Sequence, residues 1–184
     1  MTLFVPNTGI MCSLNSETGF WLTQMDTTLS KDAFFMKRAL ELSQSAADCG
    51  EVPVGAVIVY KGEIVGEGYN QPISSCDPTA HAEVMAMRQA CDTLNNYRLT
   101  GCELYVTIEP CTMCVGAMVH ARIKRVVFGA LEPRAGALQS QFRLMENSPY
   151  NHSIVWSGGV LGEQCGAIMA DFFRQKRSIK KVAK

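Results

Sequence analysis

The chain has 184 residues, of which 47% are hydrophobic and 18% are charged, and its formal net charge at pH 7 is zero. This composition is that of a globular protein and excludes a disordered or fibrous chain, and the length fits one domain with a substantial core. No apolar run is long enough to cross a bilayer, so we expect no membrane partner.

The first 30 residues show no clear hydrophobic periodicity and contain no Lys or Arg. They therefore lack the basic start of a secretory signal and the arginine-rich pattern of a transit peptide. We expect residues 1–30 to form a loosely ordered extension and residues 31–184 to form the folded domain, which ends in a basic C-terminal helix. Met25 begins a segment that looks like a natural chain start.

Helix and strand patterns then alternate. Apolar residues at helical spacing run from Phe35 to Ala46, and Ser30 is expected to be the N-cap of this helix. The β-rich run over 52–60, a Lys-Gly turn and the run over 63–70 predict a hairpin.

The second half continues this alternation. Residues 76–91 predict a helix, with Asp77 or Thr79 as its cap and Pro78 in its first turn. The remaining elements are expected to be strands over 102–108, 123–130 and 152–158, helices over 111–122 and 162–181, and a loop over 132–141. We therefore predict the α/β class, as a three-layer α/β/α sandwich with a mixed sheet that combines the antiparallel hairpin with parallel crossovers.

The chain contains eight cysteines and no export signal, so we expect reduced thiols and a cytoplasmic location. In a reducing compartment, clustered cysteines indicate metal binding or catalysis. Six cysteines occur singly and are interpreted as small buried or incidental thiols. Cys111 and Cys114 form a C-x-x-C pair, which alone fits a redox dithiol, a structural zinc knuckle or half of a catalytic metal site.

Two upstream residues favour the catalytic interpretation. A structural knuckle would need a second C-x-x-C or an H-x-x-x-H pair, and the sequence has neither. His81 lies at the expected start of a helix and can join Cys111 and Cys114 around one Zn²⁺, which leaves a fourth tetrahedral position open for water. Glu83 lies close enough in sequence to move protons beside the metal without binding it.

The segments "HAE" at 81–83 and "PCTMC" at 110–114 form the pattern H-x-E…P-C-x-x-C, in which the chain resembles the zinc-dependent nucleobase deaminases. The resemblance implies a cytidine deaminase-like fold with a mixed five-stranded sheet and one Zn²⁺ per subunit at two helix N-termini. His81, Cys111 and Cys114 would bind the metal, and Glu83 would protonate N1 of the base and then the departing amino group.

The flanking segments are similar to those of one branch, the bacterial tRNA-specific adenosine deaminases. They include "EVPVGAVIV", "DPTAHAE", "LYVTIEPCTMC" and "RVVFGA", and the resemblance extends from Phe35 to Arg177. It implies a homodimer that binds the tRNA anticodon stem-loop and hydrolyses the wobble adenosine to inosine, with release of ammonia. A free-nucleobase deaminase of the guanine or cytosine type is the alternative, which would explain the two motifs but not these flanks.

The same resemblance assigns substrate contacts. Asn70, the backbone of Ala82 and the side chain of Val54 would line the pocket for the flipped-out nucleotide, and Asn151 would help hold the anticodon loop. Each position also has a plainer interpretation, since Val54 could be strand core and the asparagines could be turn formers.

The last fourteen residues carry six basic side chains and one acidic side chain, which fits an RNA partner. Arg174, Arg177 and Phe173 are candidate RNA contacts in this segment, although cations also suit the C-terminal end of any helix. Glu132 and Pro133 stand where the family commonly has an Asp near the RNA, so contacts there are expected to differ.

Two other classes of function remain open. A zinc-stabilised RNA-binding protein without activity would have no use for the Glu83 carboxylate beside the metal. A thiol–disulfide redox protein would hold Cys111 and Cys114 as a dithiol without zinc.

Overall fold

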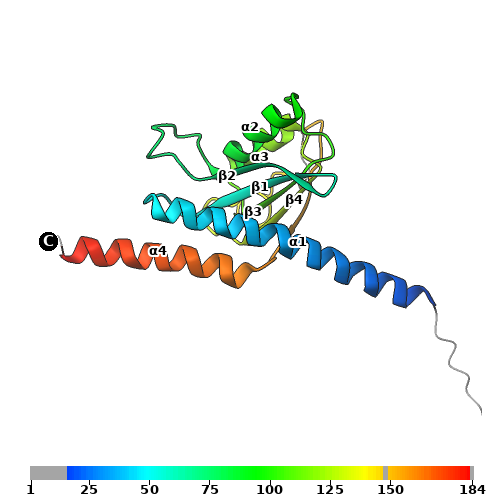
Figure 1. Cartoon of the computed structure of the whole chain (residues 1–184), viewed down its shortest axis with the longest axis horizontal. Helices are drawn as coiled ribbons and strands as arrows, with labels where there is room; N and C mark the ends of the chain where they lie inside the picture. Colours follow the sequence, from blue (N-terminus) through cyan, green and yellow to red (C-terminus); the bar gives the residue numbers. More distant parts are fainter. Residues whose placement is uncertain (1–15, 147–148, 183–184) are drawn as a thin grey trace, which may run out of the picture.

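The computed structural model describes residues 16–146 and 149–182 (Figure 1). Its helices are α1 (Ser16–Asp48), α2 (Ala82–Leu94), α3 (Thr112–Ala121) and α4 (Gly162–Val182). Its strands are β1 (Gly55–Tyr60), β2 (Glu63–Tyr69), β3 (Glu103–Ile108), β4 (Arg125–Ala130) and β5 (Val155–Gly158). None of these helices is both long and apolar enough to cross a membrane.

The five strands form one mixed sheet in the order β2-β1-β3-β4-β5. Strand β1 is antiparallel to both of its neighbours, β2 and β3, whereas β3, β4 and β5 are parallel to one another. The predicted hairpin and the predicted parallel crossover through α3 are therefore confirmed. The connection from β4 to β5 has no helix in its described residues, 131–146 and 149–154, and its first part, residues 131–141, returns to the segment that follows β3.

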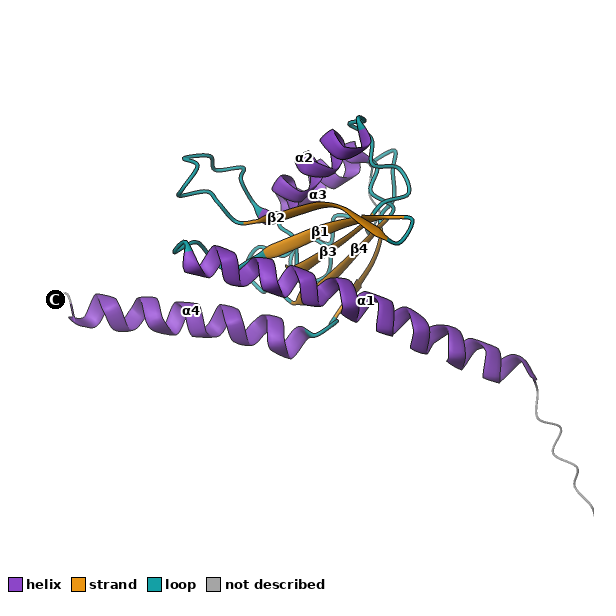
Figure 2. Cartoon of the chain, viewed as in Figure 1, coloured by secondary structure: helices purple, strands orange, loops and turns teal. Residues whose placement is uncertain are grey.

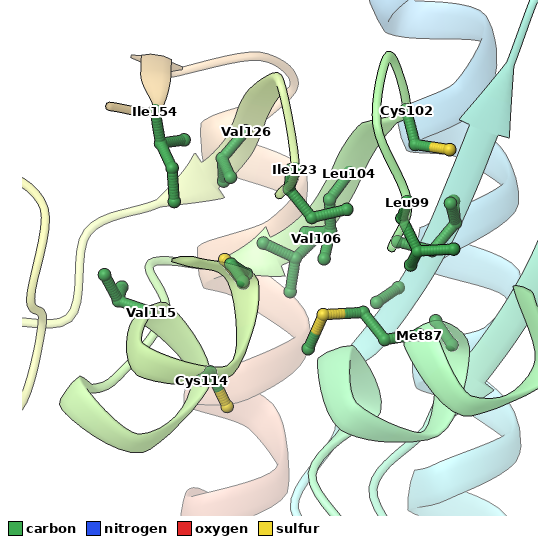
Figure 3. Close-up of a cluster of buried hydrophobic side chains, with 14 of the residues drawn as sticks. Met87, Leu99, Cys102, Leu104, Val106, Cys114, Val115, Ile123, Val126 and Ile154 are labelled. Atoms are coloured by element: carbon green, nitrogen blue, oxygen red, sulfur yellow. The ribbon is translucent and has the colours of Figure 1, made fainter. Parts of the chain in front are cut away.

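Two helical layers cover the sheet, α2 and α3 on one face and α1 and α4 on the other (Figure 2). Strand residues alternate between them: Leu104 and Val106 face the α2–α3 layer, and Tyr105 between them faces α1. Figure 3 shows Met87 of α2 close to Leu104 and Val106, within the core on the α2–α3 side. The predicted three-layer α/β/α sandwich is confirmed.

Two glycines in β2 set the separation between the edge strand and α2. A β-carbon on Gly66 would lie 2.3 Å from the carbonyl oxygen of Ala86, and one on Gly68 would lie 2.4 Å from that of Ala82. Backbone thus packs directly on backbone, and the first turn of α2 is held at the end of β2.

A buried polar network fastens α1 to the opposite end of the sheet. Asp32 of α1 accepts two hydrogen bonds from the Arg125 guanidinium, at 2.6 and 2.8 Å. The Tyr105 hydroxyl lies 2.9 Å from Asp32 Oδ1 and 2.8 Å from Glu103 Oε2. The network joins α1, β3 and β4 where the two parallel strands begin.

Two predicted helix starts differ from the structure. Helix α1 begins at Ser16, so Ser30 lies inside a helix; residues 16–30 contain no proline to end one. Residues 1–15 lie outside the described part of the chain, and a boundary between extension and domain near residue 30 stays a prediction.

Helix α2 begins at Ala82 instead of residue 76. The Asp77 carboxylate accepts hydrogen bonds from the backbone N–H and hydroxyl of Thr79, at 2.8 and 2.7 Å. This local turn competes with the helix. As a result Asp77 and Thr79 do not cap α2, and Pro78 precedes the helix.

Candidate metal centre and active site

Three side chains at two neighbouring helix N-termini form a group suited to a metal. His81 is the N-cap residue of α2, Cys111 is the N-cap residue of α3, and Cys114 lies in the first turn of α3. His81 Nδ1 is 3.7 Å from Cys111 Sγ and 3.6 Å from Cys114 Sγ, and the two sulfurs are 3.7 Å apart. Their ligand atoms all lie within 4.8 Å of one another.

These separations match a tetrahedral zinc site. With Zn–S bonds of about 2.3 Å and a Zn–N bond of about 2.0–2.1 Å, tetrahedral angles place two sulfurs about 3.8 Å apart and a sulfur and a nitrogen about 3.6 Å apart. Three ligands leave one position for water or substrate, which is the arrangement of a catalytic zinc site. The residues present therefore fit one Zn²⁺.

The environment of Cys111 favours the thiolate that a metal needs. Hydrogen bonds from the Cys114 side chain and from His81 lower the pKa of the Cys111 thiol to about 4, against the opposing effect of burial. The partial positive charge at the start of α3 also favours a negative sulfur.

Glu83 lies in the first turn of α2, two residues after His81, and is 4% exposed. Burial raises the pKa of its carboxyl group above the usual range. The carboxyl group accepts a hydrogen bond from its own backbone N–H and interacts with Cys114, yet it is outside the three-ligand group. Glu83 thus places a carboxyl group beside the metal site without contributing a ligand.

A cavity of about 290 Å³ opens onto this group. His81, Glu83 and Cys111 line it together with apolar side chains, including Val54 and Phe173. Its volume is near the lower end for small-ligand sites, roughly 300–1,000 Å³. The cavity suits one flat heterocycle, while a ribose-phosphate chain attached to that ring would stay outside.

Asn70 ties this cavity to the start of α2. Its buried side-chain oxygen accepts a hydrogen bond of 2.9 Å from the backbone N–H of Ala82. The backbone N–H of Asn70 donates to the Val54 carbonyl oxygen at 3.1 Å. Among the described residues no acceptor bonds the side-chain nitrogen of Asn70, which leaves a donor for a ligand. Ala82 is fully buried, and its backbone N–H is bonded to Asn70. Ala82 therefore influences the cavity by orienting the Asn70 side chain.

Comparison with known proteins decides between deaminase families. Residues 29–130 match the family model described as the cytidine and deoxycytidylate deaminase zinc-binding region. A tRNA-specific adenosine deaminase from Haemophilus influenzae is 47% identical over 154 residues, which cover 83% of this chain and 89% of that protein. The chain belongs to the tRNA-specific adenosine deaminase family.

Solved structures agree with this membership. One, from a study of A-to-I editing by tRNA:A34 deaminases at the wobble position of tRNA, has a TM-score of 0.72 and 39% identity and covers 73% of this chain and 98% of that one. A guanine deaminase from Bacillus subtilis has 48% identity over a shorter match, 53% of this chain and 63% of that one, with a TM-score of 0.51.

The three candidate RNA contacts of α4 line the cavity or a groove beside it. Phe173 of α4 forms part of the cavity wall, and it also borders a groove of about 610 Å³ between α4 and residues 130–134. Arg174 and Arg177 line that groove together with Arg134, which the sequence interpretation did not single out.

Asn151 is not brought to the cavity. It is exposed and precedes β5, at the end of the sheet where β4 also begins, whereas Cys111 follows the opposite end of β3. Its side-chain oxygen accepts a hydrogen bond of 2.8 Å from Arg122 of the same subunit.

Glu109 lines the cavity and was missed by the sequence interpretation. It directly follows the apolar strand β3 and precedes Pro110 and Cys111, and a charged residue in that position was the available signal. Burial acts to raise the pKa of its carboxyl group, but hydrogen bonds from Ser140, Gln139 and Glu132 outweigh burial and hold that pKa below the usual range.

Proposed function

We propose that this protein hydrolyses adenosine to inosine at the wobble position of tRNA anticodons and releases ammonia. The observation that carries the proposal is the open His81–Cys111–Cys114 group beside a buried Glu83, in a chain of the tRNA-specific adenosine deaminase family. The cavity accepts one ring, so the target base has to leave the stack of the anticodon loop before it reacts.

His81, Cys111 and Cys114 would hold one Zn²⁺ per subunit, and the bound metal would lower the pKa of a water molecule in the open position. Glu83 carries the protons on its carboxyl oxygen. It takes two protons in turn, both of them from the hydrolytic water, and delivers one to N1 of adenine and the second to the departing amino group, which leaves as ammonia. The burial of Glu83 keeps bulk water from taking part in these transfers.

Asn70 and the apolar walls orient the base. The side-chain nitrogen of Asn70 can donate a hydrogen bond to a ring acceptor, while Val54, Ile108 and Met169 exclude water around the ring. Because the Asn70 oxygen is held by Ala82, the direction of the donor is fixed before the substrate binds.

The groove beside α4 suits the RNA backbone. Arg134, Arg174 and Arg177 supply positive charge for phosphates, and Phe173 offers a ring, 43% exposed, for stacking by an unpaired base. A second hollow of about 370 Å³ also borders Phe173, and Ile73 and Phe172 are among the residues that line it. Nucleotides that flank the target adenosine can therefore bind protein surface next to the cavity.

Hydrolytic deamination of a free nucleobase is the second candidate function. The 48% identity with a guanine deaminase over about half of this chain favours it. The deciding experiment incubates the protein with a tRNA transcript that carries a wobble adenosine and, separately, with free adenine, guanine and cytosine. We expect inosine in the transcript and no turnover of the free bases. Turnover confined to a free base would reject the proposal.

We further propose a cytoplasmic homodimer. Accessible or partly accessible apolar side chains on α3 and on the loop after β4 support the dimer, among them Met113, Ala117 and Phe142, the last 55% exposed. Light scattering during gel filtration should give twice the 20.2 kDa of one chain. A mass of one chain at micromolar concentration would reject the dimer.

A further inference from the structure

The Glu109 carboxylate is surrounded by the loop that follows β4. It is 3% exposed, and Oε1 accepts hydrogen bonds from the backbone N–H groups of Leu138, Gln139 and Ser140, at 3.1, 2.7 and 2.9 Å. Oε2 accepts from the backbone N–H of Glu132 at 3.2 Å and from the Ser140 hydroxyl. One buried carboxylate thus collects donors from both ends of the 132–140 segment.

Backbone groups neutralise this charge, without an ion pair. No Lys or Arg lies within salt-bridge distance of Glu109 in the described part of the chain. A buried carboxylate without such donors is strongly disfavoured, and charged hydrogen bonds are among the stronger ones. The loop and the carboxylate therefore stabilise each other.

Gly136 shows how closely the loop approaches. A β-carbon at this position would lie 2.4 Å from both Cδ and Oε2 of Glu109, and 2.6 Å from the carbonyl oxygen of Glu132. Gly136 also forms a backbone bridge with Cys111, and the Ala137 N–H donates to the Pro110 carbonyl oxygen at 2.9 Å. The loop lies directly against the Glu109–Cys111 segment.

The part of the loop that Glu109 holds faces the substrate. Glu132 and Ala135 line the cavity, and Pro133 and Arg134 line the neighbouring groove. The next part is anchored independently, because Leu138 is fully buried in the core on the α2–α3 side. Loss of the Glu109 hydrogen bonds should therefore release the N–H groups of Glu132 and of residues 138–140 and loosen residues 132–136, while Leu138 stays in the core and the domain stays folded.

We infer that Glu109 is a positioning residue that fixes the 131–141 loop as the substrate-facing wall of the cavity and groove. It acts on the substrate through the loop and leaves metal binding and proton transfer to His81, Cys111, Cys114 and Glu83. The activity part of this inference rests on the proposed action on tRNA, whereas the structural part does not.

The test is the Glu109→Gln variant. The side chain keeps its shape, but one carboxylate oxygen becomes an NH2 group that faces the N–H or O–H donors of the loop. With an anticodon stem-loop RNA that carries a wobble adenosine, we expect KM to rise about tenfold or more while kcat changes less than about threefold. Hydrogen exchange of the amides of 138–140 should accelerate by at least about tenfold, with exchange in β3 and β4 unchanged. Zinc content should stay at one per subunit.

Gly136→Ala should give the same pattern, because the added methyl group of the loop would collide with the Glu109 carboxylate and push the two apart. Glu163→Gln, an exposed acid in the first turn of α4, is the matched control and should change none of these quantities. If Glu109→Gln does not fold, Ser140→Ala removes a single donor and takes its place.

Loss of zinc, faster exchange throughout the sheet, or unchanged exchange at 138–140 would each overturn the inference. The exchange measurement needs no activity, so it decides the role of Glu109 even if the protein proves inactive on tRNA.

Discussion

The backbone N–H of Ala82 donates a hydrogen bond of 2.9 Å to the side-chain oxygen of Asn70, which joins the end of β2 to the first turn of α2. This bond satisfies one of the unpaired N–H groups at a helix start. It also fixes the Asn70 side-chain nitrogen as a donor inside the cavity. One side chain thus serves helix stability and substrate orientation.

Two substitutions at Asn70 should separate these roles. Asn70→Asp keeps the acceptor for Ala82 but loses the donor, so we expect a near-normal melting temperature and a fall in kcat/KM of about tenfold or more. Asn70→Ala loses both, and we expect the same fall together with about 1–2 kcal/mol of lost stability. Calorimetry and steady-state kinetics measure the two effects. Equal stability of the two variants would contradict the capping role.

Glu83→Gln should abolish deamination while zinc and RNA binding persist, because the amide cannot carry the protons. Removal of a general acid–base group typically lowers the rate by about 10²–10⁴-fold. Single-turnover assays give the rate, elemental analysis gives the zinc content and fluorescence anisotropy gives RNA affinity. Turnover within threefold of the wild-type rate would remove Glu83 from the mechanism.

Zinc removal should abolish activity and leave the fold intact, because the two core clusters consist mainly of apolar side chains of the sheet and its helices, and of the three metal-binding residues only Cys114 is a buried member of one. Dialysis against a chelator followed by circular dichroism and activity assays, before and after zinc is restored, measures this. A structural site would instead unfold on chelation. Activity that survives in zinc-free protein and depends on a thiol oxidant would favour the redox interpretation.

Arg177→Ala should weaken RNA binding and reduce its salt dependence, since each phosphate contact contributes about 0.7–0.9 to the slope of log K against log salt. Lys124→Ala is the matched control, because Lys124 is exposed immediately before β4, at the end of the sheet opposite the cavity. Anisotropy titrations at several salt concentrations provide both slopes. Equal slopes for the two variants would place the RNA elsewhere.

Acid should destabilise the protein through Asp32. Burial acts to raise the pKa of this carboxyl group, but hydrogen bonds from Arg125 and Tyr105 outweigh it and hold the folded-state pKa below the ordinary value. A group with a lowered pKa stabilises the fold above its unfolded pKa, roughly 3.9, and loses that contribution as pH falls through the folded value. Asp32→Asn should cost about 3 kcal/mol at neutral pH and flatten the acid limb of the stability curve in urea titrations. An unchanged acid limb would contradict this account.

The metal group could be predicted from sequence because its residues lie in two short local motifs at helix starts. His81 and Cys111 follow from the motifs alone, even though the helix start near Asp77 was wrong by several residues. The roles of Glu109 and Arg134 could not be predicted, because they depend on how the loop after β4 returns to the end of β3. The hydrogen-bond donors to Glu109 lie 23–31 residues further along the chain. The length of α1 was missed because residues 16–30 have no apolar periodicity to indicate a helix.

Gly66 and Gly68 contribute no side chain to the contact between β2 and α2, so the β2 backbone lies against the backbone of α2. The relative position of Asn70, His81 and Glu83 is therefore set by contact between two backbones and cannot be adjusted by choosing a larger or smaller residue. Substitutions in this contact cannot be used to change the substrate, because even Gly68→Ala should displace the first turn of α2 and with it the Glu83 carboxyl group. Changes of specificity have to come from positions away from this contact, such as Pro72, Arg134 and Ala135, whose side chains line the cavity or the groove beside it.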